Sequence, residues 1–190
     1  MKIITISGKS GSGKSYVAKL IASVFDANLI DIDEISHKTL ELENVKNEIK
    51  KMFGKGVFDG DNISRKKLSQ IVFSSPEKLD FVNNLCWPEI DKIVDERLSN
   101  KKINILDYSL LPKMKYFAPS IKILVEANKN VRKNRILTRD KISEPLFELR
   151  EKNSLKYCKK DFDIVVNNNN DIDKNDIINK INAFLGEQND

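Results

Sequence analysis

The chain has 190 residues, of which 40% are apolar and 32% charged, and its formal net charge is +5. This length favours one domain with room for one inserted lobe, and the apolar content can fill a sizeable core. No stretch approaches the ~20 apolar residues of a membrane span, and the lysines are interspersed with acids rather than forming an aromatic–basic stripe, so neither a membrane nor a nucleic acid is expected as partner.

The first predicted elements surround a glycine-rich octet. The apolar run Ile3–Ile6 predicts a buried strand, and apolar residues at i, i+3, i+4, i+7 and i+8 predict an amphipathic helix over residues 17–25. Between them, residues 8–15 read Gly-Lys-Ser-Gly-Ser-Gly-Lys-Ser and match the phosphate-loop pattern G-x-x-x-x-G-K-[ST] without a mismatch. Strand, glycine loop and helix in this order is the context that the motif requires. The alternative is a glycine-rich turn that merely opens a helix.

The chemistry of phosphate binding explains these residue types. Glycines let backbone N–H groups face a phosphate, and the helix N-terminus adds partial positive charge. Lys14, which we expect to be partly exposed, is predicted to reach the β- and γ-phosphates, and the Ser15 hydroxyl to bind Mg²⁺. We therefore predict ATP and Mg²⁺ as ligands. The residues predicted to contact the nucleotide here are Gly8, Lys9, Ser10, Gly11, Ser12, Gly13, Lys14, Ser15 and Tyr16.

A predominantly helical stretch follows the second predicted strand, Asn28–Asp31. Apolar spacing predicts helices over residues 45–53 and 68–72. Ser75 and Pro76 have the residue types of an N-cap and first helical position, for a helix through Leu85. Pro88 is expected to begin another helix.

The remaining elements alternate again between strand and helix. Strands are predicted at Ile103–Asp107, Ile121–Val125 and Ile164–Val166, with a basic helix over residues 130–140. A polar asparagine loop precedes a terminal helix, capped near Asp173 and stopped by Gly186. The alternation predicts an α/β fold with a parallel sheet covered by helices and a helical insert between the second and third strands.

Ligands of such sheets bind at the carboxyl ends of the strands, which draws attention to three acids. Asp31 and Asp33 follow the second strand, and Asp107 ends the third. A carboxylate there can hold Mg²⁺ or accept a proton from an attacking hydroxyl. Asp33 could instead cap a helix, and Asp107 could be an ordinary turn acid. Beside a phosphate loop, we favour the functional interpretation.

Several later segments resemble the dephospho-coenzyme A kinase family, and the similarity runs over nearly the whole chain. The resemblance is carried by five segments: Leu29–His37 with its Asp-x-Asp, the stretch from Phe53 to Ser74 around Arg65, Ile105–Leu111, the pair Arg139-Asp140 together with Arg135, and Asp163–Asn168. The chain departs from the family at Trp87, where His is usual, at Ser109, which replaces Pro, and at Lys141, which replaces Gly. Lys113 and residues 148–152 also differ.

The resemblance implies a three-layer P-loop kinase fold with a five-stranded parallel sheet, a helical substrate lobe and a lid. On this basis the single domain 1–190 divides into a core of about 1–35 and 101–190, a substrate-binding insert of about 36–100, and a lid of about 130–155. The implied reaction moves the γ-phosphate of ATP to the ribose 3′-hydroxyl of dephospho-coenzyme A.

The resemblance also assigns roles to individual residues. Asp33, Lys14 and Arg139 are the implied catalytic residues, and Arg135, Arg139 and Asn168 complete the nucleotide site. The acceptor-binding residues that we expect are Asp33, His37, Arg65, Trp87 and Leu110, of which the resemblance implies Asp33 and Arg65. The metal ligands that we expect are Ser15, from the phosphate-loop pattern, and Asp107, from its place at a strand end. Plainer interpretations stay open: an exposed helix residue for His37, a core residue for Trp87, and a solvated helix face for the arginines.

Two other functions remain to be separated from this one. The first is another small-molecule P-loop kinase, acting on nucleosides or nucleoside monophosphates, and the second is a non-catalytic nucleotide-dependent switch. The first residues lack the pattern of a secretory signal peptide, so we expect a cytoplasmic protein. Cys86 and Cys158 are far apart and are expected to be free thiols. We expect a monomer, with self-association left open.

Overall fold

The computed structural model describes residues 1–170 and 172–187. The chain forms two compact units. Unit 1 comprises Met1–Asp31, Leu98–Ile142 and the described residues from Leu155 onward, whereas unit 2 comprises Ile32–Arg97 and Ser143–Ser154.

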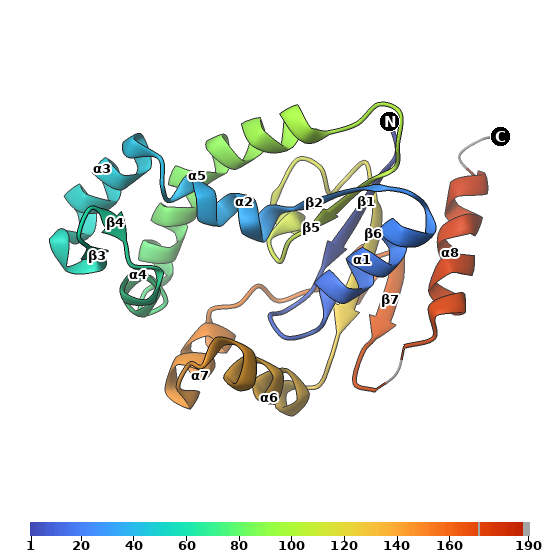
Figure 1. Cartoon of the computed structure of the whole chain (residues 1–190). Helices are drawn as coiled ribbons and strands as arrows, with labels where there is room; N and C mark the ends of the chain where they lie inside the picture. Colours follow the sequence, from blue (N-terminus) through green and yellow to red (C-terminus); the bar gives the residue numbers. More distant parts are fainter. Residues whose placement is uncertain (171, 188–190) are drawn as a thin grey trace. The chain divides into compact units, whose positions relative to one another are not determined.

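Unit 1 is built on a parallel sheet (Figure 1). Its strands are β1 (Ile3–Ser7), β2 (Asn28–Asp31), β5 (Asn104–Asp107), β6 (Ile121–Glu126) and β7 (Ile164–Asn167). They lie in the order β2-β5-β1-β6-β7, and every neighbouring pair is parallel. The predicted α/β class with a five-stranded parallel sheet is confirmed. Because all five strands run the same way, their carboxyl ends share one edge of the sheet.

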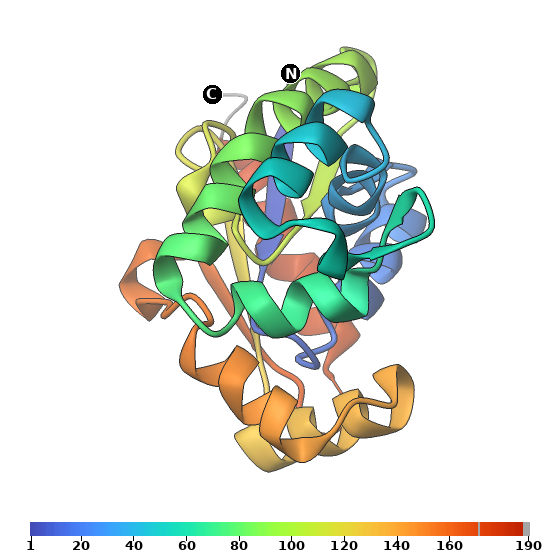
Figure 2. The same ribbon diagram turned by 90° about the vertical axis from the view of Figure 1, so that its left-hand side faces the viewer.

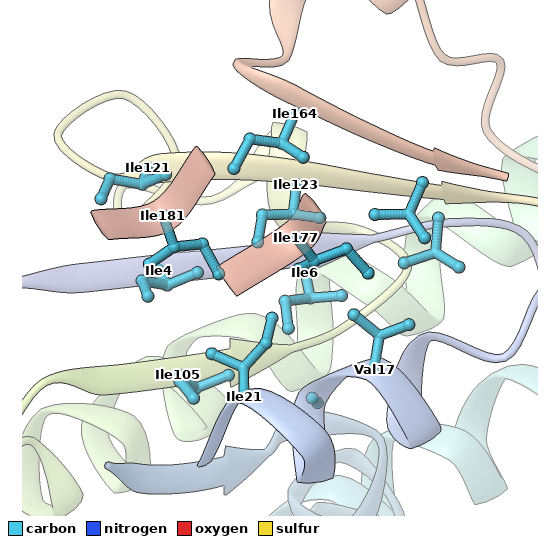
Figure 3. Packing of buried hydrophobic residues seen from close by; sticks show 13 residues of the cluster. Ile4, Ile6, Val17, Ile21, Ile105, Ile121, Ile123, Ile164, Ile177 and Ile181 are labelled. Atoms are coloured by element: carbon cyan, nitrogen blue, oxygen red, sulfur yellow. The ribbon is translucent and has the colours of Figure 1, made fainter. Parts of the chain in front are cut away.

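One face of this sheet is covered by α1 (Lys14–Val24) and α8 (Lys174–Glu187). Val17 and Ile21 of α1 and Ile177 and Ile181 of α8 stand one helical turn apart, so each pair points to the same side (Figure 3). They pack against alternate residues of the strands, such as Ile4 and Ile6. Alternation follows from the pleat, which sends successive side chains to opposite faces. This core fixes the start of α1 relative to the end of β1.

Most of the other helices of unit 1, and most of their ends, agree with the predictions made from the sequence. The basic helix is α6 (Lys129–Asp140), and short 3₁₀ turns occupy Leu111–Lys113 and Lys159–Asp161. The Asp173 cap is confirmed, because its carboxylate accepts a hydrogen bond from the Asp176 N–H at 3.0 Å. The expected stop at Gly186 is wrong, since α8 continues to Glu187. Gly186 is not among the glycines with a positive φ, so it does not adopt the left-handed conformation by which glycine ends a helix.

Unit 2 consists of α2 (Ile32–Thr39), α3 (Glu43–Phe53), α4 (Arg65–Val72), α5 (Pro76–Arg97) and α7 (Glu144–Lys152). The first three contact α5, the longest of these helices (Figure 2). The Ser75 cap of α5 is confirmed, as its hydroxyl accepts a hydrogen bond from the Lys78 N–H at 3.4 Å.

The predicted helix boundary at Pro88 is wrong, because α5 runs through it from Pro76 to Arg97. Proline removes one backbone hydrogen bond and normally ends or kinks a helix. Here Cys86, Ile90 and Val94 are all buried and stand at i, i+4 and i+8, on both sides of the proline. Packing of this continuous apolar face against the neighbouring helices outweighs the local preference.

Unit 2 also contains a hairpin that the helical patterns did not predict. Strands β3 (Phe58–Asp59) and β4 (Asn62–Ile63) pair antiparallel around Gly60-Asp61, and an η1 turn (Lys55–Val57) precedes them. Gly60 has φ 62°, and glycine at the first central position is the mark of a two-residue hairpin turn. The Gly-Asp pair, with Phe58 two residues before it and Ile63 two residues after it, was the available signal.

Both cysteines are free thiols, as predicted, with Cys86 buried and Cys158 exposed. Burial raises the pKa of the Cys86 thiol above its usual value. Across residues 1–170 and 172–187, no helix combines the length and apolar character needed to cross a membrane.

Candidate active site

The glycine octet forms a tight loop between β1 and α1, held in place on three sides. A Cβ at Gly8 would lie 2.3 Å from the Val125 carbonyl oxygen at the end of β6. At Gly11 it would lie 2.7 Å from the Arg132 carbonyl oxygen on α6. At Gly13 it would lie 2.0 Å from Nδ2 of Asn168, which follows β7. Since real Cβ atoms do not approach other atoms this closely, each glycine is required by what surrounds it.

Two side chains fasten the loop to the rest of unit 1. Nδ2 of Asn168, a buried residue, donates a hydrogen bond to the Ser12 carbonyl at 2.8 Å. Nη1 of Arg135 donates to the Gly11 carbonyl at 3.3 Å. Both bonds take up carbonyl oxygens, and this leaves backbone N–H groups as the polar groups that the loop can turn to an anion. Gly13, at φ 92°, then leads into α1, whose N-terminus carries partial positive charge.

Lys14 is buried, with a relative exposure of 8%, which corrects the expectation of a partly exposed charge. Its Nζ lies 3.7 Å from Oδ1 of Asp107, itself only 2% exposed. The end of β5 therefore supplies a buried counter-charge, and Lys14 is positioned before any phosphate arrives. Sequence pattern could not predict this burial, because it depends on how β5 sits beside β1.

The other loop residues differ in accessibility. Ser10, Ser15 and Tyr16 are exposed, whereas Ser12 is fully buried. Within the described residues, the Ser12 hydroxyl has no hydrogen-bond partner in the protein. A buried hydroxyl without a partner is costly, so a bound polar group at this loop would stabilise it.

An open pocket of about 400 Å³ adjoins the start of α1. It is lined by Tyr16, Asn168, Asn170, Ile172 and Lys174. The aromatic ring and the amides provide one flat apolar surface and several hydrogen-bonding groups. This combination suits a planar, polar ring such as a nucleobase.

The three acids at the strand ends are divided between the two units. Asp31 and Asp107 are register partners on the neighbouring strands β2 and β5 of unit 1. Asp33 lies two residues beyond β2, in the first turn of α2 in unit 2. Its backbone carbonyl accepts a hydrogen bond from the Ser36 hydroxyl at 2.8 Å. His37 lies one helical turn further along α2 and is exposed.

The remaining predicted residues are also divided. Arg65 is exposed at the first residue of α4, and Trp87 is half-buried within α5, both in unit 2. Leu110, half-buried, and Arg139, exposed in the last turn of α6, belong to unit 1. The Arg139 guanidinium bonds to the neighbouring Asp140 carboxylate, with Nε 2.6 Å from Oδ1. Unit 1 thus gathers the loop, Asp107, Arg135 and Asn168 at one place.

Arg132 was not predicted from the sequence to contribute to the site, and Ser12 was predicted only as one of the loop residues that contact the nucleotide. Arg132, which stood in a run of basic residues, is buried, and its Nε donates to the Ala127 carbonyl at 3.0 Å. Its backbone forms the wall against which Gly11 fits. Ser12 stood within the motif at a position that accepts any residue, so nothing marked its hydroxyl as special.

Comparison with known proteins shows the family to which the chain belongs. The family model for dephospho-CoA kinase matches residues 2–174, which include all of unit 2 and most of unit 1. The chain belongs to the dephospho-CoA kinase family. A dephospho-CoA kinase from Fusobacterium nucleatum subsp. nucleatum is 33% identical over 189 residues, covering 96% of each chain. One from Aquifex aeolicus is 36% identical over 162 residues, covering 82% of this chain and 81% of its own.

Solved structures support the fold. The Thermus thermophilus protein TT1252 has a TM-score of 0.75 and 28% identity, with 98% of this chain and 97% of that chain covered. A dephospho-CoA kinase from Campylobacter jejuni has a TM-score of 0.53 at 23% identity, covering 98% and 96%, and supports the fold. The predicted P-loop kinase fold and the predicted family are confirmed.

Proposed function

We propose that this protein transfers the γ-phosphate of ATP to the 3′-hydroxyl of the ribose of dephospho-coenzyme A, the last step of coenzyme A synthesis. The observation that carries this proposal is the family match over residues 2–174. Because that match includes unit 2 as well as the loop, it concerns the acceptor and not only the nucleotide. The loop alone would not distinguish this function from that of a nucleoside kinase or a switch.

The phosphate loop is the proposed site for the ATP polyphosphate. Its braced carbonyls, the N-terminus of α1 and the partnerless Ser12 hydroxyl all suit an anion with several oxygens. Lys14, held beside Asp107, would contact the β- and γ-phosphate oxygens. The pocket beside Tyr16 and Asn168 would take the adenine ring.

We place Mg²⁺ at Ser15 and Asp107. Ser15 is exposed at the loop, and Asp107 stands at the strand end in register with a second acid, Asp31. Oxygen ligands of this kind suit Mg²⁺, which keeps most of its waters and binds through few protein groups. When bound there, the ion would neutralise charge on the phosphates. Among the described residues, no group of three or more His, Cys, Asp or Glu side chains could hold a metal by itself, which is consistent with a site shared with a nucleotide.

Asp33 is the proposed base of the reaction. The 3′-oxygen of the acceptor forms a bond to the γ-phosphorus as the bond from that phosphorus to the β,γ-bridging oxygen breaks and ADP leaves. The proton of the hydroxyl passes to the Asp33 carboxylate. Transfer requires this carboxylate within hydrogen-bond reach of the hydroxyl, and α2 presents it in its first turn. His37, on the same side of α2 one turn later, would contact the acceptor.

The N-terminus of α4 is the proposed phosphate contact of the acceptor. Its first turn contains Arg65, Lys66 and Lys67 but no acid. Cations are unfavourable at a helix N-terminus, since the helix dipole already makes it positive. A phosphate of dephospho-coenzyme A would relieve this repulsion, and the planar fork of Arg65 fits two phosphate oxygens. Trp87 and Leu110 would pack against the less polar parts of the acceptor.

Arg135 and Arg139 are proposed to stabilise the transferring phosphoryl group. They stand one turn apart on α6, and Arg135 already contacts the loop at the Gly11 carbonyl. Positive groups held at this place lower the energy of a transition state whose charge is spread over several oxygens. The lid over residues 130–155 and a cytoplasmic location both stay predictions.

An acceptor screen tests the proposal. The protein is incubated with ATP and Mg²⁺, and ADP release is followed with dephospho-coenzyme A, adenosine, AMP or no acceptor. We expect release only with dephospho-coenzyme A, and a product phosphorylated on the 3′-oxygen. Turnover with adenosine or AMP alone would instead favour a nucleoside or nucleoside monophosphate kinase, and acceptor-independent release would favour a switch.

A further inference from the structure

Helix α7 belongs to a different unit from the helix that precedes it. The chain leaves unit 1 after Ile142, only two residues beyond the end of α6, and α7 lies within Ser143–Ser154 of unit 2. The connection includes Lys141 at φ 50° and ψ 36°. Few non-glycine residues adopt this left-handed conformation, which breaks the helix between Asp140 and Glu144.

Arg150 of α7 and Asn153 at its C-terminal end contact α4 and its C-cap residue, and a third residue, Phe147, is buried. Phe147 is buried, with 2% exposure. The Arg150 guanidinium lies over the Phe73 ring, 5.6 Å from its centre, and Nη2 donates to the Ser69 hydroxyl at 3.4 Å. Nδ2 of Asn153 donates to the Phe73 carbonyl at 2.6 Å. We refer to Arg150 and Asn153, with Ser69 and Phe73, as the α4–α7 clamp.

The clamp acts on the helix that begins with Arg65. Ser69 lies within α4 and Phe73 is its C-cap residue. Asn153 therefore satisfies one of the terminal carbonyl groups that the helix itself leaves open. The guanidinium over the Phe73 ring adds a cation–π contact. Loss of either contact would make the C-terminal end of α4 more mobile. Because Arg65 is the first residue of the same helix, its orientation would then be less well defined.

Helix α6, by contrast, is fastened to the phosphate loop. Arg135 bonds to the Gly11 carbonyl, and a Cβ at Gly11 would lie 3.0 Å from Cγ1 of Ile136. Arg139 stands in the last turn of α6, three residues before the chain passes into unit 2. Arg139 therefore lies on a helix that contacts the phosphate loop, and a short stretch of chain connects that helix to α7.

From these contacts we propose that Arg150 is a positioning residue for the acceptor, and that α7 moves with α4 rather than with α6. This inference rests on the proposed function. Dephospho-coenzyme A bound at Arg65 would steady α4, the clamp would pass this order to α7, and the short connection would limit the positions open to Arg139. ATP would steady α6 from the other side.

Hydrogen exchange of the full chain separates α7 from α6. We expect dephospho-coenzyme A alone to slow exchange in residues 144–152 together with 65–72, with little change in 129–140. A nonhydrolysable ATP analogue alone should slow 129–140 and leave 144–152 largely unchanged. If the ATP analogue alone protects 129–140 and 144–152 equally, the two helices form one nucleotide lid and the proposal is overturned. This measurement needs no variant and no turnover.

A matched pair of variants tests Arg150 itself. Arg150→Ala should raise the KM for dephospho-coenzyme A about tenfold, as expected for loss of a charge-assisted hydrogen bond, while the KM for ATP stays within about twofold. Lys152→Ala removes the same charge from an exposed position on the same turn and should change neither. Arg150→Lys, which keeps the charge but loses the fork, should recover only part of the affinity.

The outcomes distinguish this inference from the proposed function. If wild-type protein fails to phosphorylate dephospho-coenzyme A, the proposed function is wrong, whatever the variants do. If wild-type protein turns over but Arg150→Ala behaves like Lys152→Ala, only the positioning role is wrong. Equal rises in both KM values for Arg150→Ala would show a general loss of structure and would also overturn it.

Discussion

The glycines of the phosphate loop and those of unit 2 serve different purposes. A Cβ at Gly8, Gly11 or Gly13 would lie 2.0–2.7 Å from a neighbouring atom. At Gly54, Gly56 and Gly60 it would meet nothing within 4 Å. In unit 1 the glycines allow other groups to close in on the loop, whereas in unit 2 they serve at most the local path of the chain. The loop is therefore shaped by its surroundings before a ligand binds.

Charges show the same contrast. In unit 1, Lys14 is buried beside Asp107, and Arg135 rests on the loop. In unit 2, Arg65 is exposed in a helix turn that contains three cations and no acid. The first site is organised in the free protein. At the second, Asp59 offsets the charge of Lys67, and a bound anion would offset the charges of Arg65 and Lys66. Substitutions in unit 1 should consequently change stability as well as turnover, and those at Arg65 should change substrate affinity alone.

The largest effect on turnover is expected at Asp33, the proposed base, which lies in unit 2. Asp33→Asn keeps the shape but removes the proton acceptor, so turnover should fall by about 10²- to 10⁴-fold. Nucleotide affinity, which depends on unit 1, should change little. Steady-state kinetics and calorimetric titration with an ATP analogue measure the two. Glu34→Gln, at the exposed neighbouring position, is the control. A loss below tenfold would return Asp33 to a structural role.

At Lys14, the difference between the two units predicts a loss of turnover together with a loss of stability. Lys14→Met should lower turnover by about 10²- to 10³-fold, the usual cost of removing one charge-stabilising group from an active site. It also takes a buried counter-charge from Asp107, so the free energy of unfolding should fall as well. Urea unfolding measures this second effect. Lys19→Met, on the exposed side of α1, is expected to change neither quantity. Unchanged stability at Lys14 would mean that the loop is less preorganised than its contacts indicate.

Two glycine variants test the contrast directly. Gly13→Ala puts a side chain at φ 92° and into Nδ2 of Asn168, so strain and loss of the hydrogen bond to Ser12 should cost about 3 kcal/mol of stability. Gly56→Ala enters open space and should be neutral or stabilise by up to about 1 kcal/mol, because it restricts the unfolded chain. Urea unfolding of both, beside the wild type, gives the difference. Similar losses in the free energy of unfolding at the two positions would contradict the proposed difference between the glycines of the two units.

The sequence predicted best those parts that depend on local order along the chain. The parallel sheet, the loop and the caps at Ser75 and Asp173 each follow from residues close in sequence. It failed where contacts distant in sequence decide the outcome. Pro88 lies inside α5 because the buried residues Cys86 and Ile90 continue across it.

The same division holds within the site. The motif identified every residue of the loop, but the burial of Lys14 depends on Asp107, 93 positions later in the chain. Asn168 was expected near the nucleotide, yet its bond to the Ser12 carbonyl joins β7 to the loop, which no local pattern reveals. Likewise, Arg150 attracted attention only as a departure from the family, and its partners lie about 80 residues earlier.

The smallest effect is expected at Arg65, and it identifies the acceptor. Arg65→Lys keeps the charge at the first residue of α4 but loses the fork that can bind two phosphate oxygens. The KM for dephospho-coenzyme A should rise roughly ten- to hundredfold, as expected for about 1.5–3 kcal/mol from a charge-assisted pair. The KM for ATP and the melting temperature should stay unchanged, since Arg65 is exposed and shapes no other part of unit 2. If only the KM for ATP rises, Arg65 binds the phosphate donor rather than the acceptor. A fall in melting temperature would show that the N-terminus of α4 is as preorganised as the phosphate loop.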